Sequence, residues 1–135
     1  MNKENRISKA LDPLWASFIE KVDIDILNLR ITFDLVLYFS DNAIQRHKLV
    51  FDNVSSYFFV NGEGDARYNT EKWDNAELSE IYYFERSQDH ILHKNDKEGT
   101  PNYVSNPNFH LEIWGAAFMI EAKTITVDGI QYEVS

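Results

Sequence analysis

The sequence predicts a mainly β, α+β fold, either an antiparallel β-sandwich or a strongly curved sheet, with one N-terminal helix. Apolar residues alternate with polar ones over most of the chain, turn-forming residues separate these runs, and only the first part favours a helix. With 135 residues, 44% of them hydrophobic, the chain is long enough for one buried core. We therefore expect a single domain over residues 1–135, with a helical segment at 1–21 and a β domain at 22–135.

The N-terminal helix is predicted to run from about Pro13 to Lys21. Asp12 can cap its first turn, and a proline fits the first helical position because that position needs no amide donor. The apolar side chains that would share its inner face are Leu14, Trp15, Phe18 and Ile19. An additional, earlier turn through residues 7–11 stays open.

Strand periodicity begins at Val22 and continues to Phe39. The apolar positions slip by one between Ile26 and Leu29, and a slip in a two-residue period moves the side chains to the opposite face of a sheet. A bulge, or a break into two strands near Leu27-Asn28, is therefore required if both halves serve one core. The next expected elements are a turn at 40–42 and strands at 44–51 and 54–60.

The second half of the chain alternates between loops and short strands. We expect a polar loop at 63–75 and a long loop at 93–108, which holds two prolines and several asparagines. The Asp128-Gly129 pair is the strongest hairpin signal, because glycine tolerates the positive φ of a tight primed turn. The remaining strands are expected at 81–84, 109–114, 117–123, 125–127 and 130–134. With 22–39 counted as one strand and the weakly patterned strand at 44–51 left open, the total is seven or eight.

The charge and cysteine content exclude several classes of function. Asp and Glu number 22 against 13 Lys and Arg, a formal net charge of −9, which repels nucleic-acid phosphates and attracts basic partners. The absence of cysteine removes disulfides, thiolate catalysis and cysteine-ligated metals. The sequence holds neither the apolar run of a signal peptide nor that of a membrane span. We expect a cytoplasmic protein that binds neither nucleic acid nor membrane.

The histidines do not form a convincing metal site. His90 and His93 have the spacing that aligns two ligands on a helix, but on a strand the same spacing places them on opposite faces. The loop at 61–69 contains carboxylates and glycines but lacks the ligand spacing of a calcium loop. We expect no metal ion and no other cofactor. The four histidines are His47, His90, His93 and His110.

Catalytic motifs are equally weak. The carboxylate pairs Asp23/Asp25 and Glu77/Glu80 are of the type that glycosidases use, but neighbours in a strand or turn share an exposed face rather than flank a substrate. The Gly-x-Ser-x-Gly motif of a hydrolase is absent from the sequence. We therefore expect the protein not to be an enzyme.

The acidic segment from Glu63 to Asp89 is the best candidate for a binding site. It carries −5 of the net charge of −9, and aromatic residues lie between the acids, as in the contact regions of protein-binding surfaces. In the alternative interpretation it is a solvated loop whose Trp73 folds back into the core. The candidate partner-binding residues are Asp65, Tyr68, Glu71, Trp73, Asp74, Glu77 and Glu80.

The order of these segments resembles a known family. The long β stretch at 22–39, the segment His47-Lys48-Leu49-Val50-Phe51-Asp52-Asn53-Val54, the run Phe109-His110-Leu111-Glu112-Ile113-Trp114 and the final hairpin together resemble the small YxiG-like proteins of Gram-positive bacteria. These resemble immunity proteins encoded beside polymorphic toxins. The resemblance implies a cytoplasmic protein that protects its own cell by occluding a toxin domain, for which a basic nuclease would suit the acidic charge. It implies no catalytic residue.

Two classes of function therefore remain open. An immunity-type inhibitor predicts tight binding of one cognate toxin, without turnover, by a monomer or weak dimer. A small-molecule-binding or enzymatic β domain predicts a deep apolar pocket with convergent polar groups. The direction in which Trp73 and the tyrosines point distinguishes the two classes.

Overall fold

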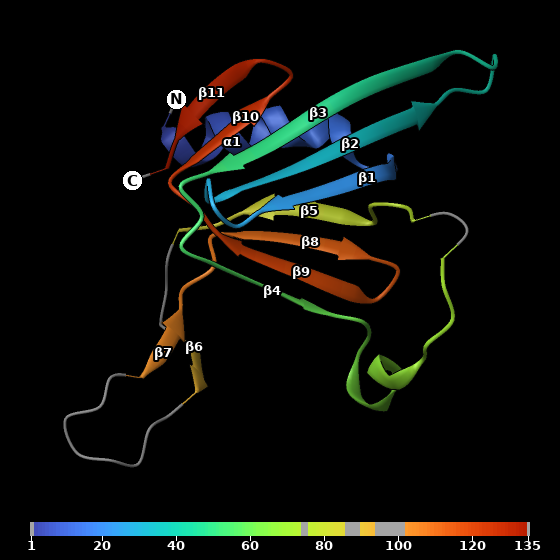
Figure 1. Cartoon of the computed structure of the whole chain (residues 1–135). Coiled ribbons are helices and arrows are strands. Elements are labelled where there is room, and N and C mark those ends of the chain that lie inside the picture. Colours follow the sequence, from blue (N-terminus) through green and yellow to red (C-terminus); the bar gives the residue numbers. More distant parts are fainter. Residues whose placement is uncertain (1, 74–75, 86–89, 94–101, 135) are drawn as a thin grey trace.

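Two antiparallel sheets face each other as the layers of a sandwich (Figure 1). The computed structural model describes residues 2–73, 76–85, 90–93 and 102–134. The first sheet has the order β1-β2-β3-β10-β11 and the second has the order β4-β9-β8-β5, while β6 and β7 form a separate two-stranded ribbon. The predicted mainly β fold with one N-terminal helix is confirmed.

The described residues form eleven strands, more than the seven or eight expected. Residues 22–39 divide into two strands around the predicted break, and β7 lies inside the region expected to be a long loop. The first sheet consists of β1 (Phe18–Asp25), β2 (Arg30–Tyr38), β3 (Ile44–Asp52), β10 (Thr124–Val127) and β11 (Ile130–Glu133). The second consists of β4 (Ser56–Val60), β5 (Glu80–Tyr83), β8 (Phe109–Ile113) and β9 (Ala116–Glu121). The ribbon consists of β6 (His90–His93) and β7 (Tyr103–Ser105).

The predicted position of the helix is wrong. The helix α1 spans Lys3–Leu11, and its first turn is capped by Asn2, whose side-chain oxygen accepts a hydrogen bond of 2.8 Å from the backbone of Asn5. Ile7 and Leu11, four residues apart, form its buried face. No helix among the described residues is long and apolar enough to cross a membrane.

The expected start at Asp12-Pro13 is instead a short 3₁₀ turn, η1 (Asp12–Leu14). Ala16 has a φ of 70°, which ends the helical region, and the chain then continues directly into β1. Phe18 and Ile19 thus lie in a strand, which aromatic and β-branched residues favour. Of the four apolar residues expected on the helix face, Trp15 is 64% exposed.

The core between the sheets is built around four phenylalanines. The rings of Phe51 (β3) and Phe109 (β8) meet edge to face with centroids 5.0 Å apart, and those of Phe33 (β2) and Phe118 (β9) meet at 5.5 Å. Three of the four are completely buried. Burial of such a side chain contributes about 1.5–3 kcal/mol, and each edge-to-face pair adds about 0.5–1.5 kcal/mol. These contacts hold the two layers together.

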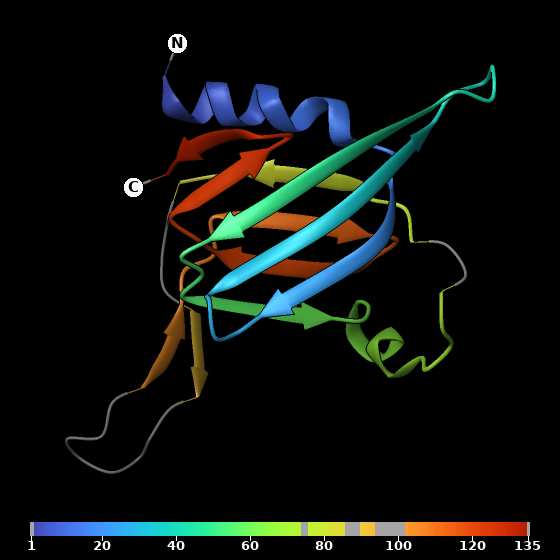
Figure 2. The same ribbon diagram turned by 45° about the horizontal axis from the view of Figure 1, so that its top comes forward.

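The two edges of the sandwich differ. The helix α1 runs along the edge formed by β11 and β5, where Ile7 and Leu11 complete the core (Figure 2). At the opposite edge, where β1 and β4 end their sheets, none of the described residues forms a helix that gives such a cover. Val22 and Ile24 lie opposite the buried Phe33 and Ile31, so they face the inner side as the period predicts, yet they stay exposed. The sandwich is therefore open at the edge between β1 and β4.

The predicted turn at Asp128-Gly129 is confirmed. The two residues have φ values of 50° and 87° and join the directly paired Val127 and Ile130, as in a type I′ hairpin. The Asp128 carboxylate also accepts a 2.8 Å hydrogen bond from the Lys48 backbone and lies 2.6 Å from Nδ1 of the buried His47. The turn thus fastens the hairpin to β3.

We predict that Gly129→Val destabilises the protein by about 1–2 kcal/mol, because a β-branched residue resists a φ of 87°. Urea unfolding measures the loss of free energy. Gln131→Val is the matched control, since it places the same side chain on an exposed strand position two residues away. An unchanged unfolding midpoint for Gly129→Val would contradict the assigned turn type.

Candidate functional site

The acidic loop that follows β4 has a defined conformation. Asn61 closes it by donating a 2.5 Å hydrogen bond to the backbone oxygen of Asn69, and the 3₁₀ turn η2 (Gly64–Tyr68) lies between them. Gly62 packs so closely on this turn that a Cβ atom would come within 3.0 Å of the Ala66 backbone. The end of the loop at Asn69 is therefore held in place, and the chain continues from there to Trp73.

Three aromatic side chains meet at the end of this loop. The ring centroids of Trp73 and Trp114 are 6.5 Å apart, and those of Trp73 and Phe59 are 6.1 Å apart, with both pairs edge to face. Trp73 is 39% exposed, Phe59 45% and Trp114 50%. We call this group the aromatic ridge: Phe59, Trp73 and Trp114. Its side chains lie at the surface, so Trp73 does not fold back into the core as the alternative interpretation required.

Trp114 occupies an unfavourable backbone position. With Gly115 it forms the two-residue turn between β8 and β9, with φ values of 48° and 86°. These angles nearly repeat those of the Asp128-Gly129 turn. Asn, Asp and Gly are preferred at the first position of such a turn, whereas a positive φ costs a bulky residue about 1–2 kcal/mol. A tryptophan therefore stands, half exposed, where the fold would favour a small polar residue.

A shallow depression adjoins the ridge. It has a volume of about 360 Å³ and is lined by Trp73 and Trp114 together with Asn61, Glu63 and Glu71. The hollow thus combines two indole rings with two carboxylates. Such a combination attracts cations, because the faces of aromatic rings and the oxygens of carboxylates both have a negative electrostatic potential.

The structure separates the other predicted site residues. Asp65 is fully exposed and lies 3.8 Å from the Arg67 guanidinium, which in turn lies over the ring of the exposed Tyr68. Asp74 lies outside the described residues. Glu77 pairs with Phe18 beside β1, and Glu80 lies on β5 opposite Glu112. Glu71 and Trp73 meet at the depression, while Glu77 and Glu80 belong to other elements.

The comparison with known proteins agrees with the resemblance noted from the sequence. Residues 7–132 match the YxiG-like protein family. The chain belongs to this family. It is also 27% identical over 124 residues to the Uncharacterized protein YxiG of Bacillus subtilis (strain 168). The aligned region covers 84% of this chain and 85% of that relative.

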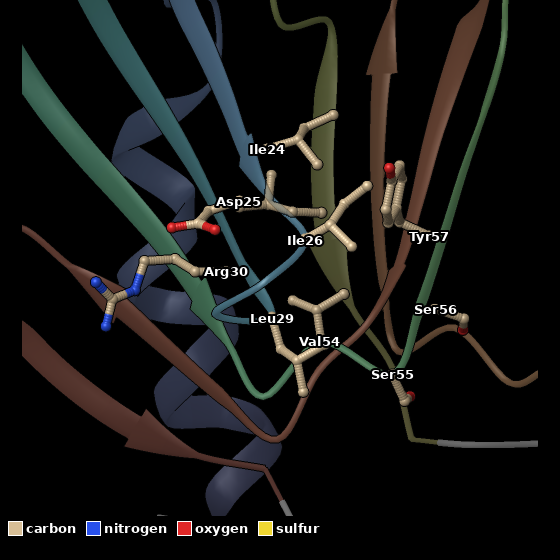
Figure 3. Close-up of a pocket in the computed structure, with 10 residues that line it drawn as sticks. Ile24, Asp25, Ile26, Leu29, Arg30, Val54, Ser55, Ser56 and Tyr57 are labelled. Atoms are coloured by element: carbon tan, nitrogen blue, oxygen red, sulfur yellow. The ribbon is translucent and has the colours of Figure 1, made fainter.

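A second hollow of this YxiG-like protein lies at the open edge of the sandwich. This groove has a volume of 390 Å³ and is lined mainly by apolar side chains, among them Ile24, Ile26 and Tyr57. Figure 3 shows Ile24 and Ile26 on the side of Tyr57, while the charged groups of Asp25 and Arg30 point away from it.

The polar side chains around the groove already have partners. Arg30 donates a 2.7 Å hydrogen bond to Asp52, and Asp25 accepts one of 2.7 Å from Asn28. The Ser55 hydroxyl donates to the Glu121 carboxylate at 2.5 Å. Groups held in this way are not aimed at a ligand, so the groove does not match the pocket with convergent polar groups that a small-molecule site requires.

The outer face of the second sheet of this family member carries a polar group around His110, formed with Tyr82, Glu80 and Glu112. The hydroxyl of Tyr82 lies 2.8 Å from Nδ1 of His110, and Glu80 and Glu112 lie next to them on the two strands. Burial lowers the pKa of His110, although Glu112 and Glu80 oppose this effect. Burial also raises the pKa of Tyr82, and the same two carboxylates add to it. These shifts fit a neutral His110 ring whose Nδ1 accepts a hydrogen bond from the Tyr82 hydroxyl.

The histidines that the structure describes do not gather. His47 is buried against Asp128, His110 contacts Tyr82, and His90 is exposed on the separate ribbon. Within the described ranges no group of three or more His, Cys, Asp or Glu side chains is arranged to hold a metal ion. That the protein works without a metal stays a prediction.

We predict that His110 titrates below its ordinary pKa of 6.5, because its partial burial disfavours the charged ring. The unfolded chain then takes up a proton at a higher pH than the folded protein. The contribution of the neutral His110 ring to the free energy of unfolding is therefore complete above pH 6.5 and is lost as the pH falls through the folded-state pKa. NMR titration of the ring measures the midpoint. In His110→Gln this part of the pH dependence of unfolding should disappear; a midpoint above 6.5 would contradict the assigned environment.

Proposed function

We propose that this YxiG-like protein is a non-catalytic, cytoplasmic binding protein of the immunity type, which neutralises a cognate toxin by covering it. The aromatic ridge and the acidic loop beside it form the contact surface. Binding by occlusion needs neither a metal nor a catalytic group, in agreement with the expectation from the sequence.

The position of Trp114 carries this proposal. A half-exposed tryptophan in a strained turn destabilises the free protein, and backbone strain of this kind concentrates at functional sites. The second tryptophan, Trp73, contacts it, and tryptophan is enriched among the residues that dominate binding energy. The ridge thus has the composition of the centre of a protein–protein interface.

The charge around the ridge indicates the chemistry of the partner. Glu63 and Glu71 line the depression beside the two indoles, and the exposed Asp65 lies in the same loop. On a chain with a net charge of −9, these carboxylates raise the encounter rate with a basic protein. The depression suits a lysine or arginine side chain of such a partner, through carboxylate pairing and cation–π contact. A basic nuclease toxin has this chemistry.

We predict that Trp114→Asn separates binding from stability. Relief of about 1 kcal/mol of backbone strain offsets the loss of a ring contact of about the same size, so the stability should stay near that of the parent. Dissociation from the toxin should accelerate by about 30-fold, equivalent to about 2 kcal/mol. The probe is the cognate toxin domain, which this proposal expects in the C-terminal part of a large secreted protein encoded by the neighbouring gene, and surface-based kinetics measure both rates.

Trp15→Ala is the matched control, because Trp15 is more exposed than Trp114, follows η1 and takes no part in the two ring contacts that form the ridge. It should leave toxin binding unchanged. Trp73→Ala should accelerate dissociation as Trp114→Asn does, provided that circular dichroism shows a folded variant. Equal toxin binding by Trp114→Asn and the parent would refute the contact surface, and so would equal weakening by Trp15→Ala.

We further predict that neutralising the rim acts on association. Asp65→Asn combined with Glu71→Gln should slow the association rate and reduce its dependence on salt, because exposed charges act mainly on diffusional encounter. The dissociation rate should change little. Glu133→Gln, an exposed carboxylate on β11, is the control. If the double variant and the control associate at the same rate, the acidic loop does not face the partner.

A further inference from the structure

The edge of β1 that faces away from β2 is paired with another segment over only part of its length. At its start, the segment 76–78 runs antiparallel to it: the amide of Ile19 donates to the Ala76 carbonyl at 2.7 Å, and Phe18 pairs with Glu77. From Glu20 to Asp25, no described residue pairs with this side of β1. The edge therefore accepts a strand at one end, and along the rest it offers backbone groups that none of the described residues pairs.

The side chains of this free part alternate in kind. Val22 and Ile24 face the inner side of the sandwich and are exposed. Ile24 lines the groove of 390 Å³, with Tyr57 across from it (Figure 3). Asp23 and Asp25 point to the outer face, where they lie opposite Thr32 and Arg30. The edge thus presents apolar side chains on one face and, beyond Lys21, two carboxylates on the other.

We infer that β1 binds an extended segment of a partner protein as a sixth strand of the first sheet. The segment would place one apolar side chain over Val22 and another into the groove beside Ile24, and basic side chains against Asp23 and Asp25. Main-chain hydrogen bonds supply affinity in this mode of recognition, and the alternate side chains supply specificity.

This inference rests on the proposed function, because the same basic partner would supply the segment. The groove is connected to the aromatic ridge by a series of ring contacts. Tyr57 stacks on Phe118 with centroids 6.0 Å apart, Phe118 meets Phe59 at 6.0 Å, and Phe59 meets Trp73. One partner can therefore contact the ridge and the edge of β1 together.

Charge argues against a second copy of the chain as the occupant. An antiparallel pair of β1 strands that matches Val22 with Ile24 of the other copy places the two Asp23 carboxylates opposite each other. Lys21 then lies opposite Asp25, but each copy carries a net charge of −9, so the two chains repel each other. Like charges directly opposite each other in a sheet are destabilising. Basic side chains at the same positions would be stabilised.

The test uses a short capped peptide of alternating lysine and valine as the probe, titrated into the isotope-labelled protein and followed by NMR. Saturable shifts of the β1 amides from Glu20 to Asp25 are expected. A peptide with the same side chains but N-methylated at alternate residues, which cannot pair along one edge, should bind at least about tenfold more weakly. A peptide of the same composition with its lysines and valines in separate blocks should also bind more weakly.

Ile24→Ser should weaken binding of the alternating peptide. The control Ile130→Ser, on the opposite edge strand β11, should leave that binding unchanged. Equal binding of the N-methylated peptide, absence of shifts in β1, or a dimer of the protein paired through β1 would overturn the inference. The N-methylated probe acts on the parent protein, so the test holds even if Ile24→Ser does not fold. No toxin is present in this experiment, so its failure would overturn the binding of a strand to β1 and not the contact surface at the ridge. The toxin-binding measurements test that surface separately.

Discussion

The edge-to-face packing of four phenylalanines between the two sheets determines the rest of this structure. Phe51 and Phe109 join the centres of the two layers, and Phe33 and Phe118 join them nearer the β1–β4 edge. One helix covers one edge of this core, and a single short helix cannot cover both. The inner faces of β1 and β4 therefore reach the surface, and both candidate binding regions lie along that edge.

Much of the fold could be predicted from the sequence because its signals are local. The alternating pattern, the break near Leu27-Asn28 and the Asp128-Gly129 turn each depend on neighbouring residues, and the structure contains all three. The helix was misplaced because two local signals competed. The Asp12-Pro13 pair resembles a helix start, but the cap at Asn2 and the buried stripe of Ile7 and Leu11 prevail, since they add tertiary burial to local capping.

The candidate site was less predictable because it depends on which strands become neighbours. Trp73 was identified from its acidic surroundings, but Trp114 is distant in sequence and meets it only when the β8–β9 hairpin forms. A tryptophan followed by glycine between two strands was the available signal. Glu77 and Glu80 lie in the same acidic segment as Glu71, yet the chain enters β5 between them and carries them to other surfaces. Density of charge along a sequence does not determine its distribution in space.

The central claim is that the aromatic ridge contacts a protein partner. Hydrogen exchange of the protein, with and without the cognate toxin domain, tests it most directly because every amide reports independently. The account predicts increased protection in residues 69–73 and in the β8–β9 turn at Trp114-Gly115, with β11 unchanged. Protection confined to β11, α1 or the β2–β3 turn, with the ridge unaffected in a saturated complex, would contradict it.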